Sequence, residues 1–255
     1  MTKNKDLNKE SLAEIAVDPE VLARELALEL EIDPLEQIDE DVFSKGLNVT
    51  QECNEALKML KGNREERIQG LRIFCEYRDQ RSFPLLLPLL DQPCPVERMS
   101  VVYALGRNPF PSAVEKLVSL LETDDNAYVR RATAWSLANY DNQIVLEPLI
   151  NALKNDVAAV RLWSSSSLAE IGNVSLKNAQ LAAEQLLISL KIDNESGVRS
   201  NCIWSLCRLY EKLNNTFQES FVDECIKIAL FDKEPSVMEE AKTALDSMGM
   251  QGFYN

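Results

Sequence analysis

The sequence predicts an all-α protein, an α-solenoid of about six helix pairs stacked in a right-handed superhelix. Three observations predict this class. An Arg followed seven residues later by an apolar residue recurs along the chain. An apolar helical run that ends near an acidic residue precedes the copies. The alternating pattern typical of strands is absent from the sequence. Self-similarity at a period of 20–50 residues is the signature of repeat architectures, in which each unit packs only on its neighbours.

The repeated anchor defines six registers, separated by 31, 32, 31, 38 and 39 residues. Two copies are nearly the same phrase, VRRATAWSL at 129–137 and VRSNCIWSL at 198–206. The last copy has Met in place of Arg, which is typical of a terminal capping unit. The anchor pairs are Arg67/Phe74, Arg98/Leu105, Arg130/Leu137, Arg161/Leu168, Arg199/Leu206 and Met238/Leu245.

Each anchor begins the second helix of a pair, and the first helix lies directly before it. A short turn with an Asp joins the two. Gly106 and Gly172 predict the exits of two second helices, where a left-handed C-cap favours glycine. The apolar runs that predict first helices are residues 84–91, 115–125, 146–156, 183–193 and 224–232.

The chain divides into an acidic N-terminal segment (1–47), a repeat region (48–248) and a short tail (249–255). Residues 1–47 hold 13 acidic and 5 basic side chains. Residues 17–33 predict an acidic amphipathic helix, with Asp18 as its cap and Pro19 in its first turn. Residues 34–42 then predict a linker. This helix has three alternative roles: it caps the first repeat, binds a partner, or folds over the repeats.

Composition excludes several functional classes. The sequence contains no His, which removes His-dependent triads and His-ligated metal sites. A net charge of −14 disfavours binding to nucleic acid. No apolar run is long enough to span a membrane, and the first residues lack the apolar core of a signal peptide, so a cytoplasmic protein is expected.

Six cysteines occur without a CxxC pair. Reduced thiols that fill the core are the simpler interpretation. The alternative is that one or two exposed thiols carry a cluster, a cofactor adduct or a redox switch. Cys75 and Cys207 are the candidate reactive thiols, because both fall on the side of the second helix that faces away from its core stripe. They lie four repeats apart, which prevents them from sharing one cluster within a monomer.

The pattern of turn acids and helix Arg residues resembles HEAT repeats over about residues 50–246. In that family the Asp of a turn and the Arg of a second helix form a ladder between stacked units. The resemblance therefore implies a structural role for these charges. Glu97 departs from the pattern, since it stands where other repeats have Val before the Arg. The matching residues are Asp91, Asp125, Asp156, Asp193 and Asp232, together with Arg98, Arg130, Arg161 and Arg199.

Aromatic residues recur on the side of the second helix opposite its core. Val129, Thr133 and Leu137 predict the core stripe, and the sixth position after the Val points almost the other way. In HEAT-like solenoids the second helix lines the concave surface, so we expect an aromatic and Arg-lined groove in which small residues such as Gly106 leave room for a guest. Burial of the aromatics between neighbouring helices is the alternative. The groove candidates are Tyr103, Arg107, Arg131, Trp135, Asn139, Trp204 and Arg208.

Among HEAT-like families, short units containing VR-x-x-A/C-x-W-S-L most resemble the phycobilisome lyases of cyanobacteria. The resemblance implies a groove that handles an open-chain tetrapyrrole (bilin) and a phycobiliprotein subunit, with Arg residues on the bilin propionates. Glu170 is a weak candidate for an acid or base in thioether formation, and whether the protein is an enzyme stays open. The alternative is a non-catalytic scaffold for another client, such as an iron–sulfur cluster or a protein assembly. The chain's own residues predict no metal site.

Overall fold

The computed structural model describes residues 46–250, in which helices are present and strands are not. This confirms the predicted all-α class. The chain divides after Thr50 into two units, and the second unit, from Gln51 onward, holds the repeats apart from the first residues of the helix that begins at Gly46. The helix predicted at 17–33 and the linker after it lie outside the described residues, so those two expectations stay predictions.

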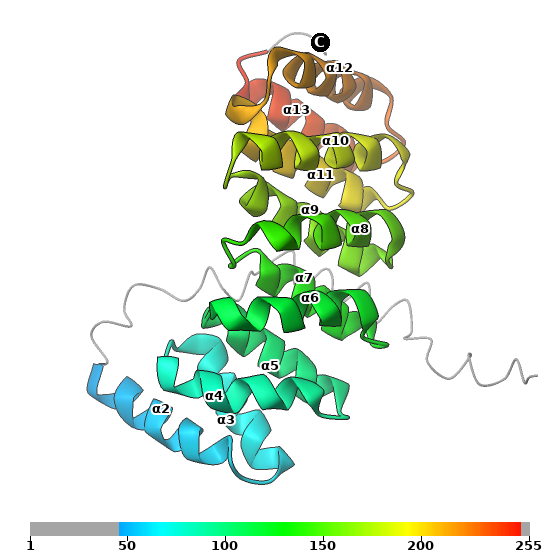
Figure 1. The fold of residues 1–255 in the computed structure, drawn as a ribbon. Helices are drawn as coiled ribbons and strands as arrows, with labels where there is room; N and C mark the ends of the chain where they lie inside the picture. Colours follow the sequence, from blue (N-terminus) through cyan, green and yellow to red (C-terminus); the bar gives the residue numbers. More distant parts are fainter. Residues whose placement is uncertain (1–45, 251–255) are drawn as a thin grey trace, which may run out of the picture. The chain divides into compact units, whose positions relative to one another are not determined.

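Six helix pairs follow one another in the described residues, as predicted (Figure 1). We number them repeats 1 to 6 and call the first helix of each pair A and the second B. The pairs are α2 (Gly46–Met59) with α3 (Arg64–Glu76); α4 (Phe83–Leu86), continued by the 3-10 helix η4 (Leu87–Asp91), with α5 (Pro95–Arg107); α6 (Val114–Thr123) with α7 (Ala127–Leu137); α8 (Leu146–Asn155) with α9 (Ala158–Gly172); α10 (Leu176–Ile192) with α11 (Ser196–Leu209); and α12 (Asn215–Phe231) with α13 (Pro235–Ser247).

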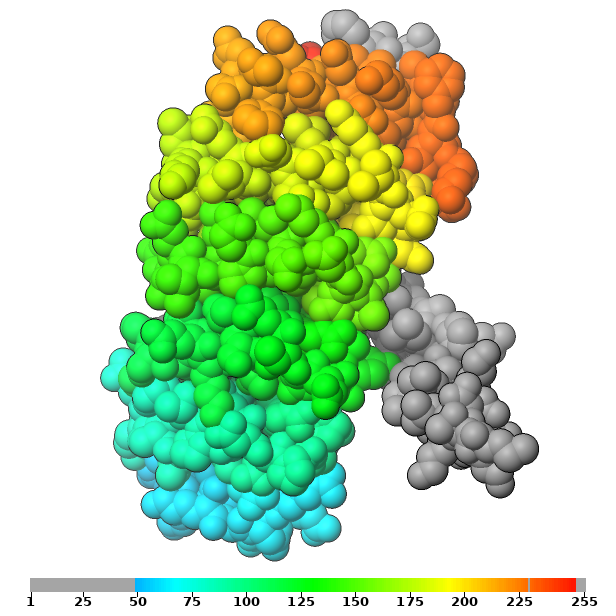
Figure 2. Space-filling model, turned by 45° about the vertical axis from the view of Figure 1, so that its right-hand side comes forward, coloured from blue at the N-terminus to red at the C-terminus, as the bar shows by residue number. Residues whose placement is uncertain are grey.

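The repeats stack in two layers. Each B helix packs on the next B helix, in the order α3, α5, α7, α9, α11 and α13. The A helices form the second layer, in which α6 packs on α8, α8 on α10 and α10 on α12. In the space-filling view the repeats follow one another as bands, each in contact with the next (Figure 2). Every repeat therefore shares its apolar surface only with its neighbours, as expected of a solenoid.

Local sequence explains where the helices begin. Asn63 forms a capping box with Glu66 at the start of α3. The Asn63 side chain accepts from the Glu66 backbone amide, and the Glu66 side chain accepts from the Asn63 backbone amide. Asn126 accepts from the amides of Tyr128 and Val129 at the start of α7. α5 and α13 each have Pro in the first turn, where a missing backbone N–H costs nothing.

The predicted core stripe is buried. Val129, Thr133 and Leu137 are each fully buried on α7, and the Thr133 hydroxyl is satisfied by the Val129 carbonyl at 2.7 Å. α11 repeats the stripe with Val198 and Cys202, which are also buried. Removing a Leu-sized side chain from water contributes about 1.5–3 kcal/mol. Residues spaced four apart on the B helices therefore supply much of the free energy that holds each pair together.

The predicted left-handed caps at Gly106 and Gly172 are wrong. Both glycines lie within helices, and Gly249 has the one positive φ found among residues 46–250. A Cβ on Gly106 would lie 2.5 Å from Cζ3 of Trp135, and one on Gly172 would lie 2.8 Å from Cδ2 of Leu209. The two glycines are small because side chains of the next B helix pack directly on the backbone there.

An Arg–Asp ladder joins successive repeats. Arg130 Nε and Nη2 donate to the Asp156 carboxylate at 2.8 and 2.7 Å, and Nη1 donates to the Asp124 carbonyl at 2.8 Å. Each ladder Arg thus binds the end of its own A helix and the carboxylate of the next one. The same arrangement recurs for Arg98 with Asp124, Arg161 with Asp193 and Arg199 with Asp232.

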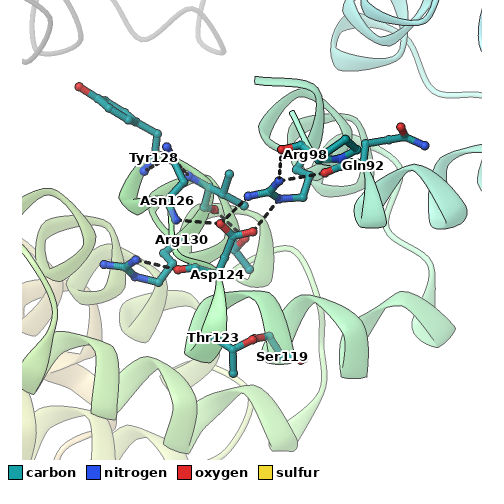
Figure 3. A network of polar contacts seen from close by, with 11 residues as sticks. Gln92, Arg98, Ser119, Thr123, Asp124, Asn126, Tyr128 and Arg130 are labelled. Atoms are coloured by element: carbon teal, nitrogen blue, oxygen red, sulfur yellow. Dashed lines mark hydrogen bonds and ion pairs between the residues drawn. The ribbon is translucent and has the colours of Figure 1, made fainter. Parts of the chain in front are cut away.

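The prediction of the acidic ladder residues is wrong at two positions, Asp91 and Asp125. Arg98 pairs with Asp124 at 2.8 Å rather than with Asp125, because Asp124 caps α6 and also accepts from the Asn126 amide (Figure 3). Asp91 pairs with Lys116 on the surface instead of joining the ladder.

In the first ion pair of the ladder, the acidic residue lies within a B helix and not at the end of an A helix. Gln92 stands six residues before Arg98, where repeats 3 and 5 have Asp, and it offers Arg98 only a backbone carbonyl, at 2.9 Å. The side chain of Glu97, 1% exposed, accepts from Arg67 at 2.5 Å instead. This explains why Glu97 departs from the Val of the other repeats.

The four serines at 164–167 mark tight packing of α9 between α7 and α11. Ser167 donates to the Ala134 carbonyl at 2.8 Å, and the Ser165 carbonyl accepts from Ser205 at 2.9 Å. Asn201 adds donations to the hydroxyls of Ser165 and Ser166 at 2.7 and 2.6 Å. Small side chains let the three B helices approach closely, and the hydroxyls of Ser165, Ser166 and Ser167 are hydrogen-bonded, whereas the buried Ser164 hydroxyl has no hydrogen-bond partner.

Candidate functional site

The predicted groove residues form two separate groups on the B helices. The first, which we call the Tyr103 cluster, comprises Tyr103 on α5 with Tyr128, Arg131 and Trp135 on α7. The Tyr103 and Trp135 ring centroids lie 5.3 Å apart with the planes tilted by 55°. Arg131 approaches the Tyr103 hydroxyl at 3.5 Å and lies 5.5 Å from the Tyr128 ring centroid. This is a packed aromatic cluster around one guanidinium.

Most of the Tyr103 cluster is occupied by its own packing. Arg131 is only 8% exposed. Trp135 is half-buried and its ring lies over Gly106, so the space that a small residue was expected to leave for a guest is filled by the protein itself. For Trp135 the alternative of packing between neighbouring B helices therefore describes the structure, and the side chain has a structural role. Arg107, beside it, donates from Nε to the Cys75 carbonyl at 3.2 Å.

The second group, the Trp204 cluster, comprises Glu170 on α9 with Trp204 and Arg208 on α11. Trp204 is 40% exposed. The Arg208 guanidinium lies 5.0 Å from the Trp204 ring centroid and is held by Glu170 at 2.7 Å. Cation–π contacts at exposed sites contribute about 0.5–1 kcal/mol, and Arg prefers to stack on Trp. The ring is thus oriented by an Arg that bridges two repeats.

Repeat 4 separates the two clusters. The position on α9 equivalent to Trp135 and Trp204 holds Ser166, which accepts from Asn201. Asn139 is exposed, with a long contact of 3.4 Å from its amide to the Ser136 carbonyl. The aromatic row expected along the B helices is therefore interrupted, and Trp204 is the candidate aromatic with the most solvent contact. Glu170 serves first as the partner that positions Arg208.

The two predicted reactive thiols are poorly suited to nucleophilic chemistry. Burial raises the pKa of Cys75 to about 12 and that of Cys207 to about 11. Both thiols are only partly exposed, and the Cys75 sulfur lies 3.7 Å from the Ser100 carbonyl of the next repeat. They lie on α3 and α11 with three B helices between them. An iron–sulfur cluster on either thiol would therefore need further thiols from another chain.

Cys94 is the thiol that the sequence interpretation missed. It is the N-cap residue of α5, where the backbone amide of Glu97, supported by the Arg64 guanidinium, lowers the pKa of Cys94 below its usual value. Arg64 Nη2 lies 3.0 Å from its sulfur. The Pro that follows Cys94 marks a helix start in the sequence, which is the signal that could have identified this environment.

Among residues 46–250 no group of three or more Cys, Asp or Glu side chains is arranged to hold a metal ion. Within the same range no helix combines the length and apolarity needed to cross a membrane.

The described residues form a helical-repeat scaffold of the kind suited to protein binding. Its helix pairs are stacked, an Arg–Asp ladder joins them, and accessible side chains lie along the B helices. The family model for HEAT repeats matches residues 54–138 and 114–207, which together span more than half of the chain. The chain therefore belongs to the HEAT-repeat family. No match is found among curated proteins.

Solved structures show the same fold at low sequence identity. An engineered protein is 20% identical, with a TM-score of 0.56 over 76% of this chain and 98% of its own. A designed armadillo repeat protein in complex with the peptide (KR)4 is 18% identical, with a TM-score of 0.55 over 78% of this chain and 98% of its own. At these identities the likeness concerns the fold alone.

Proposed function

We propose that the protein is a scaffold that binds a protein partner on the B-helix surface, with the Trp204 cluster as the anchor. The observation that carries this is the 40% exposure of Trp204, a large aromatic that its own repeats leave uncovered. Trp and Arg are the residues most enriched among those that dominate the free energy of protein association. Elsewhere on the B helices the aromatic candidates are already packed.

The Trp204 cluster is also preorganised. Arg208 is held between the Trp204 ring and the Glu170 carboxylate, so a partner would not have to order it on binding. A guanidinium has five N–H donors, and the bond to Glu170 leaves others available for a carboxylate or backbone carbonyl of the partner. The complex of a designed armadillo repeat protein with a peptide supports this proposal at the level of the fold.

The experiment compares baits that differ in one side chain. The wild-type chain, Trp204→Ala and the matched control Thr243→Ala are immobilised, and proteins retained from an extract of the native cell are quantified. Thr243 occupies the equivalent position of repeat 6 and is exposed. We expect a client that Trp204→Ala loses and Thr243→Ala keeps, with an affinity for the isolated client at least about tenfold lower in Trp204→Ala, or about 1.4 kcal/mol. Equal retention by all three baits would exclude Trp204 as the anchor.

A bilin-handling role is the second candidate, and it rests on the resemblance to phycobilisome lyases. In support, Trp204 offers a partly exposed planar surface beside Arg208, which suits a conjugated guest that carries a propionate. The client in that case is a phycobiliprotein subunit. Mixing the protein with a bilin should shift visible absorbance, and Trp204→Ala should reduce the shift. An unchanged spectrum with every bilin tried rejects this role and leaves protein binding intact.

A further inference from the structure

A second surface lies at the ends of the A helices, away from the Trp204 cluster. In every repeat from 3 to 6 the A helix ends at the residue before a ladder Asp. That residue is Thr123 in repeat 3 and Asn155 in repeat 4, but Ile192 in repeat 5 and Phe231 in repeat 6. Ile192 is 71% exposed and Phe231 is 80% exposed. Two consecutive repeats thus replace a polar residue with a large apolar one that the described residues leave uncovered.

A hollow lies between these two helix ends. α10 and α12 are neighbours in the A layer (Figure 1), and a cavity of about 460 Å³ opens between their C-terminal turns, with Ile192, Ile228 and Phe231 in its walls. The equivalent place between α6 and α8 has a cavity of about 250 Å³, lined on the α8 side by Pro148, Asn151, Ala152 and Asn155. Both cavities have polar and apolar walls, but the one between α10 and α12 is larger and has two exposed apolar side chains, Ile192 and Phe231, at its helix ends.

The charges around the larger cavity favour an acidic guest. Its walls include Lys191, Lys227 and Lys233, in a chain whose net charge is −14. Among the carboxylates there, Glu224 lies 3.9 Å from Lys191 and 3.5 Å from Lys227. The other acids and the Arg belong to the ladder: Arg161 pairs with Asp193, and Arg199 pairs with Asp232. One carboxylate therefore faces three ammonium groups.

We propose that this surface, formed by Ile192, Phe231, Lys191, Lys227 and Lys233, docks an acidic amphipathic helix of a partner protein. Packed helices lie about 8–10 Å apart, which is close to the rise of about 10.5 Å over two turns of a helix. A helix lying across the ends of α10 and α12 can therefore place apolar residues seven apart on Ile192 and on Phe231. Its carboxylates then meet the lysines, in the manner of helix-in-groove recognition.

The test uses the full chain with labelled Ile δ1 methyl groups and two synthetic peptides. The acidic probe carries Leu at every third or fourth position and Glu elsewhere, and the control probe has Lys in place of each Glu. We expect the acidic peptide to shift the methyl signals of Ile192 and Ile228, with an affinity that falls as salt is added. The same titration of Phe231→Asp should show at least about tenfold weaker binding, whereas Asn155→Asp should bind like the wild type.

A charge swap sharpens the test. The double variant Lys227→Glu, Lys233→Glu should lose the acidic peptide and gain the lysine peptide. Equal binding of the two peptides to the wild type, or unchanged binding by Phe231→Asp, overturns the proposal. Self-association that Phe231→Asp abolishes also overturns it, since the surface then belongs to a second copy of the chain. Because Trp204 is not involved, this test can fail while the function proposed for the B helices stands.

Discussion

The ladder between repeats 3 and 4 allows a quantitative test of what holds the stack together. Replacing Arg130 with Met keeps the aliphatic stem, as in the natural Met238 of repeat 6, but removes three hydrogen bonds. The Asp156 carboxylate keeps only the Val157 amide, at 2.7 Å. Since the Arg130 and Asp156 side chains are 18% and 12% exposed, water can replace little of what is lost.

The magnitude follows from that burial. Removing one partner of a buried pair costs about 3–5 kcal/mol, whereas an exposed pair contributes about 0–1 kcal/mol. Arg130 and Asp156 lie nearer the buried limit, so we expect Arg130→Met to lower the free energy of unfolding by roughly 2–4 kcal/mol. For a chain of this size each kcal/mol lowers the melting temperature by about 2–4 °C.

The assay is urea unfolding followed by circular dichroism, for Arg130→Met, Asp156→Asn and the double variant. The double-mutant cycle should give a coupling free energy of about 1–3 kcal/mol, because the two side chains contact each other directly. Lys116→Met, which breaks the exposed pair with Asp91, is the control and should cost less than about 1 kcal/mol. A loss in Arg130→Met no larger than in this control, or a coupling near zero, would refute the structural role of the ladder.

Three further predictions follow from the described residues. Cys94 should react with a thiol reagent faster than the other cysteines, and Cys94→Ser should remove the fast phase; a fast phase that survives contradicts the lowered pKa. Gly106→Val should lower stability by about 1–3 kcal/mol because Trp135 fills that space, whereas Gly197→Ala, with its nearest contact at 3.4 Å, should be neutral or stabilising in the same urea assay. Because burial raises the pKa of Cys207 to about 11, the unfolded chain loses that proton first, so stability should fall as the pH rises above about 9; Cys207→Ala should reduce the fall in urea midpoint between pH 8 and 11.

For the candidate site, residue spacing predicted which positions are equivalent but not how exposed each side chain is. The sequence placed Tyr103, Trp135 and Trp204 at equivalent positions, and all three retain some solvent contact. It could not tell that Trp135 packs on Gly106 while Trp204 stays 40% exposed, because the difference depends on the preceding B helix. Trp204 rather than Trp135 is therefore the first residue to mutate when asking what the protein binds.

For the Arg–Asp ladder, the sequence predicted the Arg residues but not every acidic partner. Asp124 stands six residues before Arg130, as Asp193 does before Arg199, but Asp156 stands five before Arg161, as Asp125 does before Arg130, so spacing could not choose between Asp124 and Asp125. No spacing rule could have found Glu97, which replaces a missing turn acid from within α5.

The sequence by itself determined the helices, their number and the apolar stripe of each, because helix periodicity, capping and repetition are local properties. The tertiary structure decided which repeated side chains stay open. Trp135 packs on a glycine of the repeat before it and is half-buried, whereas Ile192 and Phe231 line a hollow and remain exposed. The physical reason is that exposure depends on the shape of a neighbouring repeat, which no single stretch of the chain contains.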